Sequence, residues 1–224
     1  METKFWDQHY ASFRVMQPTL FAEFCAAHFI HPDDILVEVG CGNGRDAQYV
    51  APHVQDYFGL DACPKAAELC RKAIAHLYDD GVVESRVLNT DASRFDFRTV
   101  AMPGKRTVVY SRFSVHSMNY DEEDRLLNAL SMVDGPLLFL VEARTIFDKH
   151  YGEGAEVGRH EFVSDHYRRF IDPIEFISRF SRIGMPVFTS ISGGQAKFGS
   201  EDPVVLRVAF DSELLAGRNQ ICVK

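Results

Sequence analysis

The sequence predicts an α/β fold: a three-layer α/β/α sandwich with a mostly parallel sheet of about seven strands that ends in an antiparallel hairpin. Two observations predict this fold. Short apolar segments typical of buried strands alternate with amphipathic helical segments over residues 35–143, as in parallel sheets covered by helices on both faces. After residue 185, two β-rich segments are joined by a turn-rich connection, which predicts the hairpin.

The elements follow in order along the chain. The predicted strands cover residues 35–39, 56–60, 85–89, 106–113, 136–143, 186–192 and 203–210. The predicted helices cover residues 18–29, 121–133 and 172–182, and two more begin near Arg45 and Pro64. Asp172 suits the N-cap of the last helix, and Pro173 suits its first turn.

A chain of 224 residues is long enough to bury a sizeable core, and we expect a single domain over residues 1–224. Residues 1–33 are expected to form an N-terminal helical cap. The stretch 144–170 interrupts the alternation, because it is rich in glycine, histidine and arginine and has little apolar periodicity. Irregular connections of this length tend to be functional, so we expect a lid over a binding site.

Composition excludes several classes of protein. The 24 Lys and Arg residues against 32 Asp and Glu residues give a net charge of −8, which argues against nonspecific nucleic-acid binding as the main task. No apolar stretch approaches the length of a membrane span, and the start METKFWDQHY is too polar for a signal peptide. We therefore expect a cytoplasmic protein without a nucleic-acid or membrane partner, whose oligomeric state the sequence leaves open.

Neither cysteines nor histidines have the spacing of a metal site. The chain has an odd number of cysteines without a CxxC pair, which is typical of reduced thiols; they are Cys25, Cys41, Cys63, Cys70 and Cys222. His150, His160 and His166 match no standard pattern of metal ligands, so no metal is expected.

The strongest functional signal is the segment from Glu38 to Gly44, EVGCGNG, which follows the first strand and opens a helix. Glycines let a ligand approach the backbone N–H groups at the positive end of a helix. A dinucleotide fingerprint would be G-x-G-x-x-G, but here the third glycine comes one residue early and Arg45 takes its place. Asp61, at the end of the second strand, can accept both hydroxyls of a ribose.

The ExGxGxG pattern resembles motif I of the class I S-adenosylmethionine-dependent methyltransferases, which have a Rossmann-like fold. SRFxxH (111–116) resembles a subgroup of small bacterial methyltransferases of polysaccharide and small-metabolite pathways. That subgroup is also similar to this chain in PTLFAEF (18–24), GNGRD (42–46), EAR (142–144), HYRRFI (166–171) and DPVVLRV (202–208). The resemblance implies S-adenosylmethionine as cofactor and S-adenosylhomocysteine as product.

The resemblance also implies which residues bind the cofactor. Asp61 would hold the ribose, and Asp91 would bind the adenine amino group, with Asp96 as a competitor in the same loop. The implied set is Tyr10, Glu38, Gly40, Cys41, Gly42, Asn43, Gly44, Arg45, Asp61, Ala62, Asp91, Ala92, Ser111 and Arg112. Tyr10 belongs to an aromatic cluster with Phe5 and Trp6, which either folds over the cofactor or anchors the first helix.

His116 is the predicted general base, because an imidazole with a pKa near neutrality can take a hydroxyl proton; a purely structural histidine is an equally good interpretation. The residues expected around the acceptor are Arg112, His116, Arg144, His166, Tyr167 and Arg168. Guanidinium groups bind carboxylate or phosphate through paired hydrogen bonds, which favours an anionic acceptor. Ordinary ion pairing with nearby acids is the alternative, above all for Arg168 and Arg169.

The sequence therefore predicts O-methylation of a small anionic acceptor, such as a sugar, a glycan precursor, or a phosphate- or phosphonate-bearing metabolite. Oxygen is favoured over nitrogen because the chain lacks the Asn/Asp-Pro-Pro-aromatic motif of amino-group methylases. An N-methyltransferase and a non-catalytic S-adenosylmethionine-binding protein stay open as alternatives. An NAD-dependent oxidoreductase also stays open, although the glycine spacing and Glu38 count against it.

Overall fold

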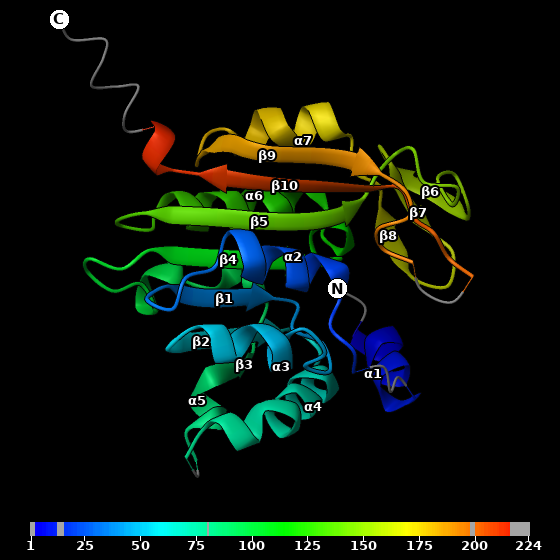
Figure 1. Cartoon of the computed structure of the whole chain (residues 1–224). Coiled ribbons are helices and arrows are strands. Elements are labelled where there is room, and N and C mark those ends of the chain that lie inside the picture. The colour runs from blue at the N-terminus through cyan, green and yellow to red at the C-terminus, as the bar shows by residue number, and fades with distance from the viewer. Residues whose placement is uncertain (1–2, 13–15, 80, 198–199, 216–224) are drawn as a thin grey trace, which may run out of the picture.

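The computed structural model describes residues 3–12, 16–79, 81–197 and 200–215. A seven-stranded sheet forms the centre, in the order β3-β2-β1-β4-β5-β10-β9 (Figure 1). Its first five strands in the chain are mutually parallel: β1 (Ile35–Val39), β2 (Asp56–Asp61), β3 (Val87–Asn89), β4 (Thr107–Arg112) and β5 (Leu137–Arg144). β10 (Val205–Asp211) lies antiparallel to β5 and to β9 (Met185–Ser192). The predicted fold class and the C-terminal hairpin are confirmed.

The register of the parallel strands brings their carboxyl ends to one edge of the sheet. Val39, the last residue of β1, pairs with Leu60 of β2 and with Ser111 of β4. Arg112 at the end of β4 pairs with Glu142 of β5. All five residues of β1 are buried, as expected for a central parallel strand covered on both faces. Loops that follow β1, β2, β4 and β5 therefore meet in one place.

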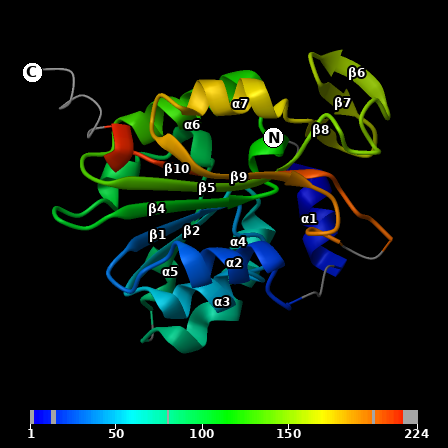
Figure 2. The same cartoon turned by 45° about the horizontal axis from the view of Figure 1, so that its top comes forward.

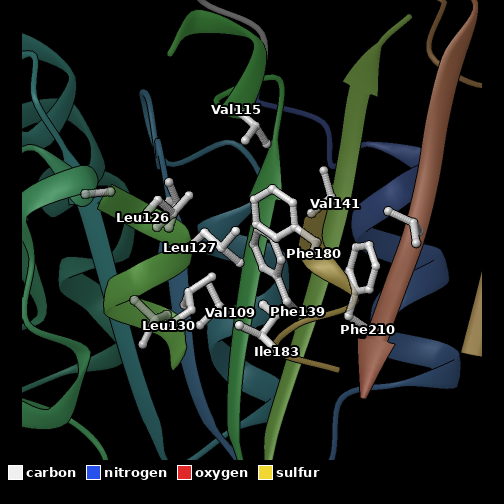
Figure 3. Packing of buried hydrophobic residues seen from close by; sticks show 14 of the residues in the cluster. Val109, Val115, Leu126, Leu127, Leu130, Phe139, Val141, Phe180, Ile183 and Phe210 are labelled. Atoms are coloured by element: carbon white, nitrogen blue, oxygen red, sulfur yellow. The ribbon is translucent and has the colours of Figure 1, made fainter. Parts of the chain in front are cut away.

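Helices cover both faces of the sheet (Figure 2). α6 (Tyr120–Ser131) and α7 (Pro173–Phe180) lie on one face, and the other carries α2 (Leu20–His28), α3 (Ala47–Val50), α4 (Pro64–Ile74) and α5 (Val83–Arg86). Figure 3 shows the core on the first face, where Leu126 and Leu130 of α6 lie near Val109 and Phe139 of the sheet. Asp172 caps α7 by accepting the backbone N–H of Ile174 at 2.9 Å, as predicted.

Within the described residues, the connections contain five short 3₁₀ turns: Ala51–His53, Ala75–Leu77, Ala92–Arg94, Phe97–Thr99 and Val115–Ser117. α1 (Thr3–Ser12), the small sheet described next and the connection between β9 and β10 lie beyond the carboxyl ends of the parallel strands (Figure 2). Cys25, Cys41, Cys63 and Cys70 are free thiols, and Cys222 lies outside the described residues. No helix among the residues described could span a bilayer.

Three elements differ from the prediction. The stretch 144–170, expected to be irregular, contains a three-stranded antiparallel sheet of β6 (Ala155–Gly158), β7 (Glu161–Val163) and β8 (Tyr167–Arg169). Its core is formed by the mutually packed rings of Tyr151, Phe162 and Phe170, which are too far apart in sequence to give a periodic pattern.

The other two differences concern element boundaries. The third strand begins at residue 87 instead of 85, because residues 83–86 form α5 and β2 offers pairing partners only from Gly59 to Asp61. The helix after the glycine turn begins at Ala47 and has four residues before it tightens into a 3₁₀ turn that contains Pro52. A proline lacks the N–H group that a longer α-helix would need there.

Candidate active site

A cavity of about 400 Å³ lies where the loops after β1, β2, β4 and β5 meet. α1 and the small sheet complete its wall. The predicted site residues that line it are Tyr10, Glu38, Gly40, Cys41, Gly42, Asn43, Arg45, Asp61, Ala62, Ala92, Arg112, His116, Arg144, His166 and Arg168. Gly44, Asp91, Ser111 and Tyr167 are not among its lining residues. The fold thus brings most of the predicted residues to one hollow.

The glycine turn has the conformation that the motif requires. Gly40, Gly42 and Gly44 have φ values of 74°, 57° and 82°, in the left-handed region that glycine tolerates best. A Cβ atom on Gly40 would lie 2.0 Å from Ser114 Oγ, and one on Gly42 would lie 2.7 Å from the Tyr10 hydroxyl. A Cβ on Gly44 would instead meet α4, 3.0 Å from the Cα atom of Cys70. Gly44 therefore allows helix packing and does not face the cavity.

Asp61 joins the glycine turn to the loop after β2. One carboxylate oxygen accepts the backbone N–H of Gly42 at 2.9 Å, and the other accepts that of Cys63 at 2.8 Å. Burial raises the pKa of Asp61 above its usual value, and these two hydrogen bonds offset part of the rise. Because an ionised carboxylate oxygen has more than one acceptor position, the side chain can take further hydrogen bonds from a ligand in the cavity.

Asp91 and Asp96 are not among the residues that line the cavity. Asp91 accepts the backbone N–H of Ser93 at 2.9 Å and caps the turn Ala92–Arg94. Asp96 accepts the backbone N–H of Arg98 at 3.1 Å in the same way. Thr90 and Ala92, the neighbours of Asp91, do line the cavity. The adenine assignment of Asp91 accordingly stays a prediction.

Two further carboxyl groups lie beside the glycine turn. Glu38 is buried and accepts a hydrogen bond from the Tyr57 hydroxyl at 2.7 Å. Burial raises the pKa of Glu38 well above its usual value. Asp46, which the sequence reasoning did not assign, accepts hydrogen bonds from the backbone N–H of Thr19 at 2.8 Å and from the Tyr110 hydroxyl at 2.8 Å. Asp46 thus connects the first turn of α2 to β4. The only sequence feature that could have indicated a role for Asp46 is its position in the GNGRD motif.

Aromatic residues of α1 close the cavity against the small sheet. The ring of Phe5 stacks on the His166 imidazole with 4.1 Å between centroids, and Trp6 meets the same imidazole edge-on at 5.4 Å. Phe5, Trp6, His9 and Tyr10 all line the cavity. The aromatic cluster of α1 thus lines the cavity, and its folding over a cofactor stays a prediction.

Three of the four arginines that line the cavity have carboxylate partners: Arg112, Arg144 and Arg168. Arg112 Nε donates to Glu142 at 2.9 Å, and Arg207 Nε donates to the other oxygen of the same buried carboxylate at 2.7 Å. Arg144 pairs with Asp148 at 3.2 Å and with Glu201. Ion pairing was the alternative for all of these arginines, above all for Arg168 and Arg169. It occurs at those two as well: Arg168 lies 3.2 Å from Asp165, and Arg169 is buried against Glu123 outside the cavity.

The two buried imidazoles of the cavity differ in their surroundings. His116 Nδ1 accepts the backbone N–H of Arg144 at 3.4 Å, whereas His166 Nδ1 lies 2.9 Å from a carboxylate oxygen of Asp165. Burial lowers the pKa of His116 well below its usual value, and burial lowers that of His166 to about 4. The expectation of a near-neutral pKa for His116 is therefore wrong, because desolvation and the nearby Arg144 disfavour the charged ring.

Phe113 is a cavity residue that the sequence reasoning missed, although it is the F of SRFxxH. Its φ of 56° lies in the left-handed region, which costs a residue with a Cβ atom about 1–2 kcal/mol. The centre of the Arg112 guanidinium lies 4.2 Å from the centroid of its ring. The connection before β10 adds Ala196 and Glu201 to the cavity, and neither carries a sequence signal.

One group of potential metal ligands occurs among the residues described, at the N-terminus of α7. It consists of His160, Asp172 and Glu175, and it lies outside the cavity. Asp172 caps the helix, and Glu175 lies 3.2 Å from Arg159. Both carboxylates thus already have protein partners.

Comparisons with known proteins agree with this geometry. Residues 36–133 match the family model described as a methyltransferase domain. The chain matches no curated protein sequence. Among solved structures it is similar to an S-adenosylmethionine-dependent methyltransferase from Methanosarcina mazei, at 12% sequence identity and a TM-score of 0.65 over 83% of this chain and 95% of that one.

Two further solved structures show the same similarity. One is the N-methyltransferase NodS from Bradyrhizobium japonicum in complex with S-adenosylhomocysteine, at 13% identity and a TM-score of 0.61 over 94% of this chain and 98% of that one. The other is an S-adenosylmethionine-dependent methyltransferase from Clostridium acetobutylicum, at 9% identity and a TM-score of 0.60 over 94% and 92% of the two chains. At these identities the similarity shows a shared fold.

Proposed function

We propose that this chain is a class I S-adenosylmethionine-dependent methyltransferase that methylates a hydroxyl oxygen of a small anionic acceptor; its methyltransferase-domain match and its fold support the proposal. The observation that carries the proposal is the set of residues that line this cavity. The glycine turn and Asp61 line it toward β2, and buried imidazoles and arginines line it toward β5. A sugar, a glycan precursor, or a phosphate- or phosphonate-bearing metabolite has both the hydroxyl and the anionic group.

The side toward β2 suits the cofactor. The lack of a Cβ atom at Gly40 and Gly42 lets Ser114 and Tyr10 lie against the backbone of the turn, and Asp61 keeps acceptor positions for ribose hydroxyls. When bound, S-adenosylmethionine supplies an electrophilic methyl group on a sulfonium. Arg45, whose Nε donates to the backbone oxygen of Gln17 at 2.8 Å, is proposed to bind the methionine carboxylate. Tyr10 of α1 would exclude water from the sulfonium.

The side toward β5 suits an anion. Within the described part of the chain, Arg112 Nε donates a hydrogen bond to Glu142, and the terminal amino groups of Arg112 have no hydrogen-bond partner. Burial and the charge of Arg112 lower the pKa of Arg45, so the two guanidiniums repel each other across the cavity wall. An anion beside Arg112 would relieve this repulsion and complete its hydrogen bonding. Tyr167, which does not line the cavity, is dropped from the acceptor site.

The two imidazoles can divide the proton chemistry. Because His116 Nδ1 accepts a backbone N–H, the neutral ring carries its proton on Nε2 and can donate it to the acceptor oxygen. His166 Nδ1 lies 2.9 Å from an Asp165 carboxylate oxygen without hydrogen-bond geometry, and a proton held there by the charge of Asp165 would leave the lone pair on Nε2. We assign orientation of the hydroxyl to His116. His166, whose pKa of about 4 makes it a weak base, takes up the hydroxyl proton only as methyl transfer makes that proton strongly acidic. With its ribose held by Asp61, the cofactor would supply the methyl group for an in-line displacement by the acceptor oxygen, with S-adenosylhomocysteine as the leaving group.

The test combines binding with turnover. We expect calorimetric titration to show binding of S-adenosylhomocysteine and no binding of NADH. A set of sugar phosphates, hydroxyalkyl phosphonates and primary amines is then incubated with methyl-labelled S-adenosylmethionine. Label in an O-methyl product supports the proposal, and label in amines alone refutes the choice of oxygen. Binding of NADH alone would overturn the cofactor assignment.

Variants test the two histidines. His116→Ala is expected to lower kcat and leave the dissociation constant of S-adenosylhomocysteine within about twofold of the wild-type value, because the residue lies on the side toward β5. His166→Gln should lower kcat and flatten its dependence on pH, since glutamine cannot accept the proton. A collapse of cofactor affinity in His116→Ala would show that His116 is structural.

N-methylation is the second candidate function. It is favoured by the similarity to structures that are named N-methyltransferases, NodS and the glycopeptide N-methyltransferase MtfA. An amine acceptor must lose its proton before it can attack, and a neutral His166 could take that proton as well. Comparing hydroxyl and amine analogues of one acceptor separates the two functions.

A further inference from the structure

Phe113 has a backbone conformation that is unusual for phenylalanine, and the turn in which it lies does not need a phenylalanine at this position. Its φ of 56° is an outlier for a bulky residue. The turn is held by backbone and neighbours: Phe113 N donates to the backbone oxygen of Glu142 at 2.9 Å, and Ser114 Oγ donates to that of Val39 at 2.7 Å. Glycine would make the same turn without the steric cost. The reason for phenylalanine must therefore lie in its ring.

The ring lies among the cationic and imidazole groups of the cavity wall. The centre of the Arg112 guanidinium is 4.2 Å from the ring centroid, and that of Arg144 is 5.6 Å away. The imidazole of His116 is 5.1 Å away, tilted by 56°. Cations within about 6 Å of an aromatic centroid are attracted by the ring, and more strongly where water is excluded. Phe113 thus contacts the side chains assigned to the acceptor.

The ring and Glu142 hold the Arg112 guanidinium between them. Glu142 fixes Nε from one side, and its carboxylate is shared with Arg207, so it neutralises Arg112 only in part. The π-face of Phe113 supports the guanidinium without using any of its N–H donors. The terminal amino groups of Arg112 therefore stay available for a ligand. A second carboxylate in the place of the ring would occupy them.

We propose that Phe113 is the specificity-determining residue of the acceptor site, because its ring fixes the Arg112 guanidinium where it receives the anionic group of the acceptor. The inference rests on the proposed function, since it takes the cavity toward β5 as the acceptor site. It narrows the acceptor to molecules whose anionic group lies close to the reacting hydroxyl. Phe113 is a positioning residue in this account, and Arg112 makes the contact.

The test uses inorganic phosphate as the probe, titrated into protein saturated with S-adenosylhomocysteine. Phe113→Leu keeps an apolar side chain and the strained turn but removes the π-face, and we expect phosphate to bind about 5- to 30-fold more weakly. Phe113→Tyr keeps the ring face and should bind phosphate within about twofold of wild type. Phe147→Leu, the same exchange at an exposed residue outside the cavity, is the matched control.

A double-mutant cycle separates positioning from a structural effect. If Phe113 acts through Arg112, Phe113→Leu should weaken phosphate binding no further once Arg112→Gln is present. Additive losses, or equal phosphate affinity in wild type and Phe113→Leu, would overturn the proposal, as would wild-type protein that binds no phosphate. Phe113→Met replaces the leucine variant if that variant does not fold. Failure to bind S-adenosylhomocysteine would instead refute the proposed function, so the two failures are distinguishable.

Discussion

Exchange of Asp61 for asparagine is the sharpest test of the cofactor site, because the carboxylate has two separable duties. Its oxygens accept the backbone N–H groups of Gly42 and Cys63 at 2.9 and 2.8 Å. Asparagine keeps one oxygen and replaces the other by an NH₂ group, which cannot accept. One backbone N–H is then left without its partner at a buried position, which costs about 1–3 kcal/mol of folding free energy.

The same exchange should weaken cofactor binding. Loss of one hydrogen bond to a ribose hydroxyl costs about 1–3 kcal/mol of binding free energy, separate from the loss of folding free energy. This corresponds to a dissociation constant of S-adenosylhomocysteine that is roughly 5- to 150-fold higher. Calorimetry measures the affinity, and urea unfolding without ligand measures the stability. Asp211→Asn, which changes a carboxylate that accepts the backbone N–H of Glu213 at 2.9 Å outside the cavity, is the control. Reduced stability with unchanged affinity would refute the ribose assignment, since Asp61 would then only join two loops.

The remaining predictions concern the adenine site, the pH dependence of stability and the glycine turn. If Asp91 binds adenine, Asp91→Asn weakens S-adenosylhomocysteine binding measurably and Asp96→Asn does not; the reverse result exchanges their roles. His166 has a folded-state pKa of about 4, below its unfolded value near 6.5, so the unfolded chain binds more protons between these values. Urea unfolding should show stability falling as the pH is lowered through this window, and less steeply in His166→Gln. Gly40→Ala should destabilise the protein by several kcal/mol, because the new Cβ would lie 2.0 Å from Ser114 Oγ; Ser114→Gly should restore part of the loss, and an additive double variant would contradict the clash.

Much of the sheet could be predicted because its signals are local. ILVEV at residues 35–39 is apolar except for Glu38, and all five residues are buried in β1. Asp172 followed by Pro173 predicts the start of α7, since both residues act within one turn. The small sheet could not be predicted, because its core consists of Tyr151, Phe162 and Phe170, which meet only in the folded chain.

The same distinction applies to the site. Gly40 and Gly42 belong to one short motif, and their backbone conformation follows from the turn that they make. The partners of the arginines could not be predicted, since Glu142 binds Arg112 of one neighbouring strand and Arg207 of the other. The lowered pKa of His116 depends on burial by segments far away in sequence, which a lone histidine in a motif does not reveal.

The strand order has a consequence for how the chain folds during synthesis. β10 lies between β5 and β9, so β9 has no place in the described sheet until β10 has paired. β9 nevertheless leaves the ribosome first, and the outer edge of β5 waits through more than 60 residues of later chain, from Arg144 to Val205, before it is covered. An uncovered strand edge can pair with other chains. Nascent chains that end before residue 205 should therefore aggregate more readily than the complete domain, and docking of the last strand should limit the rate of folding.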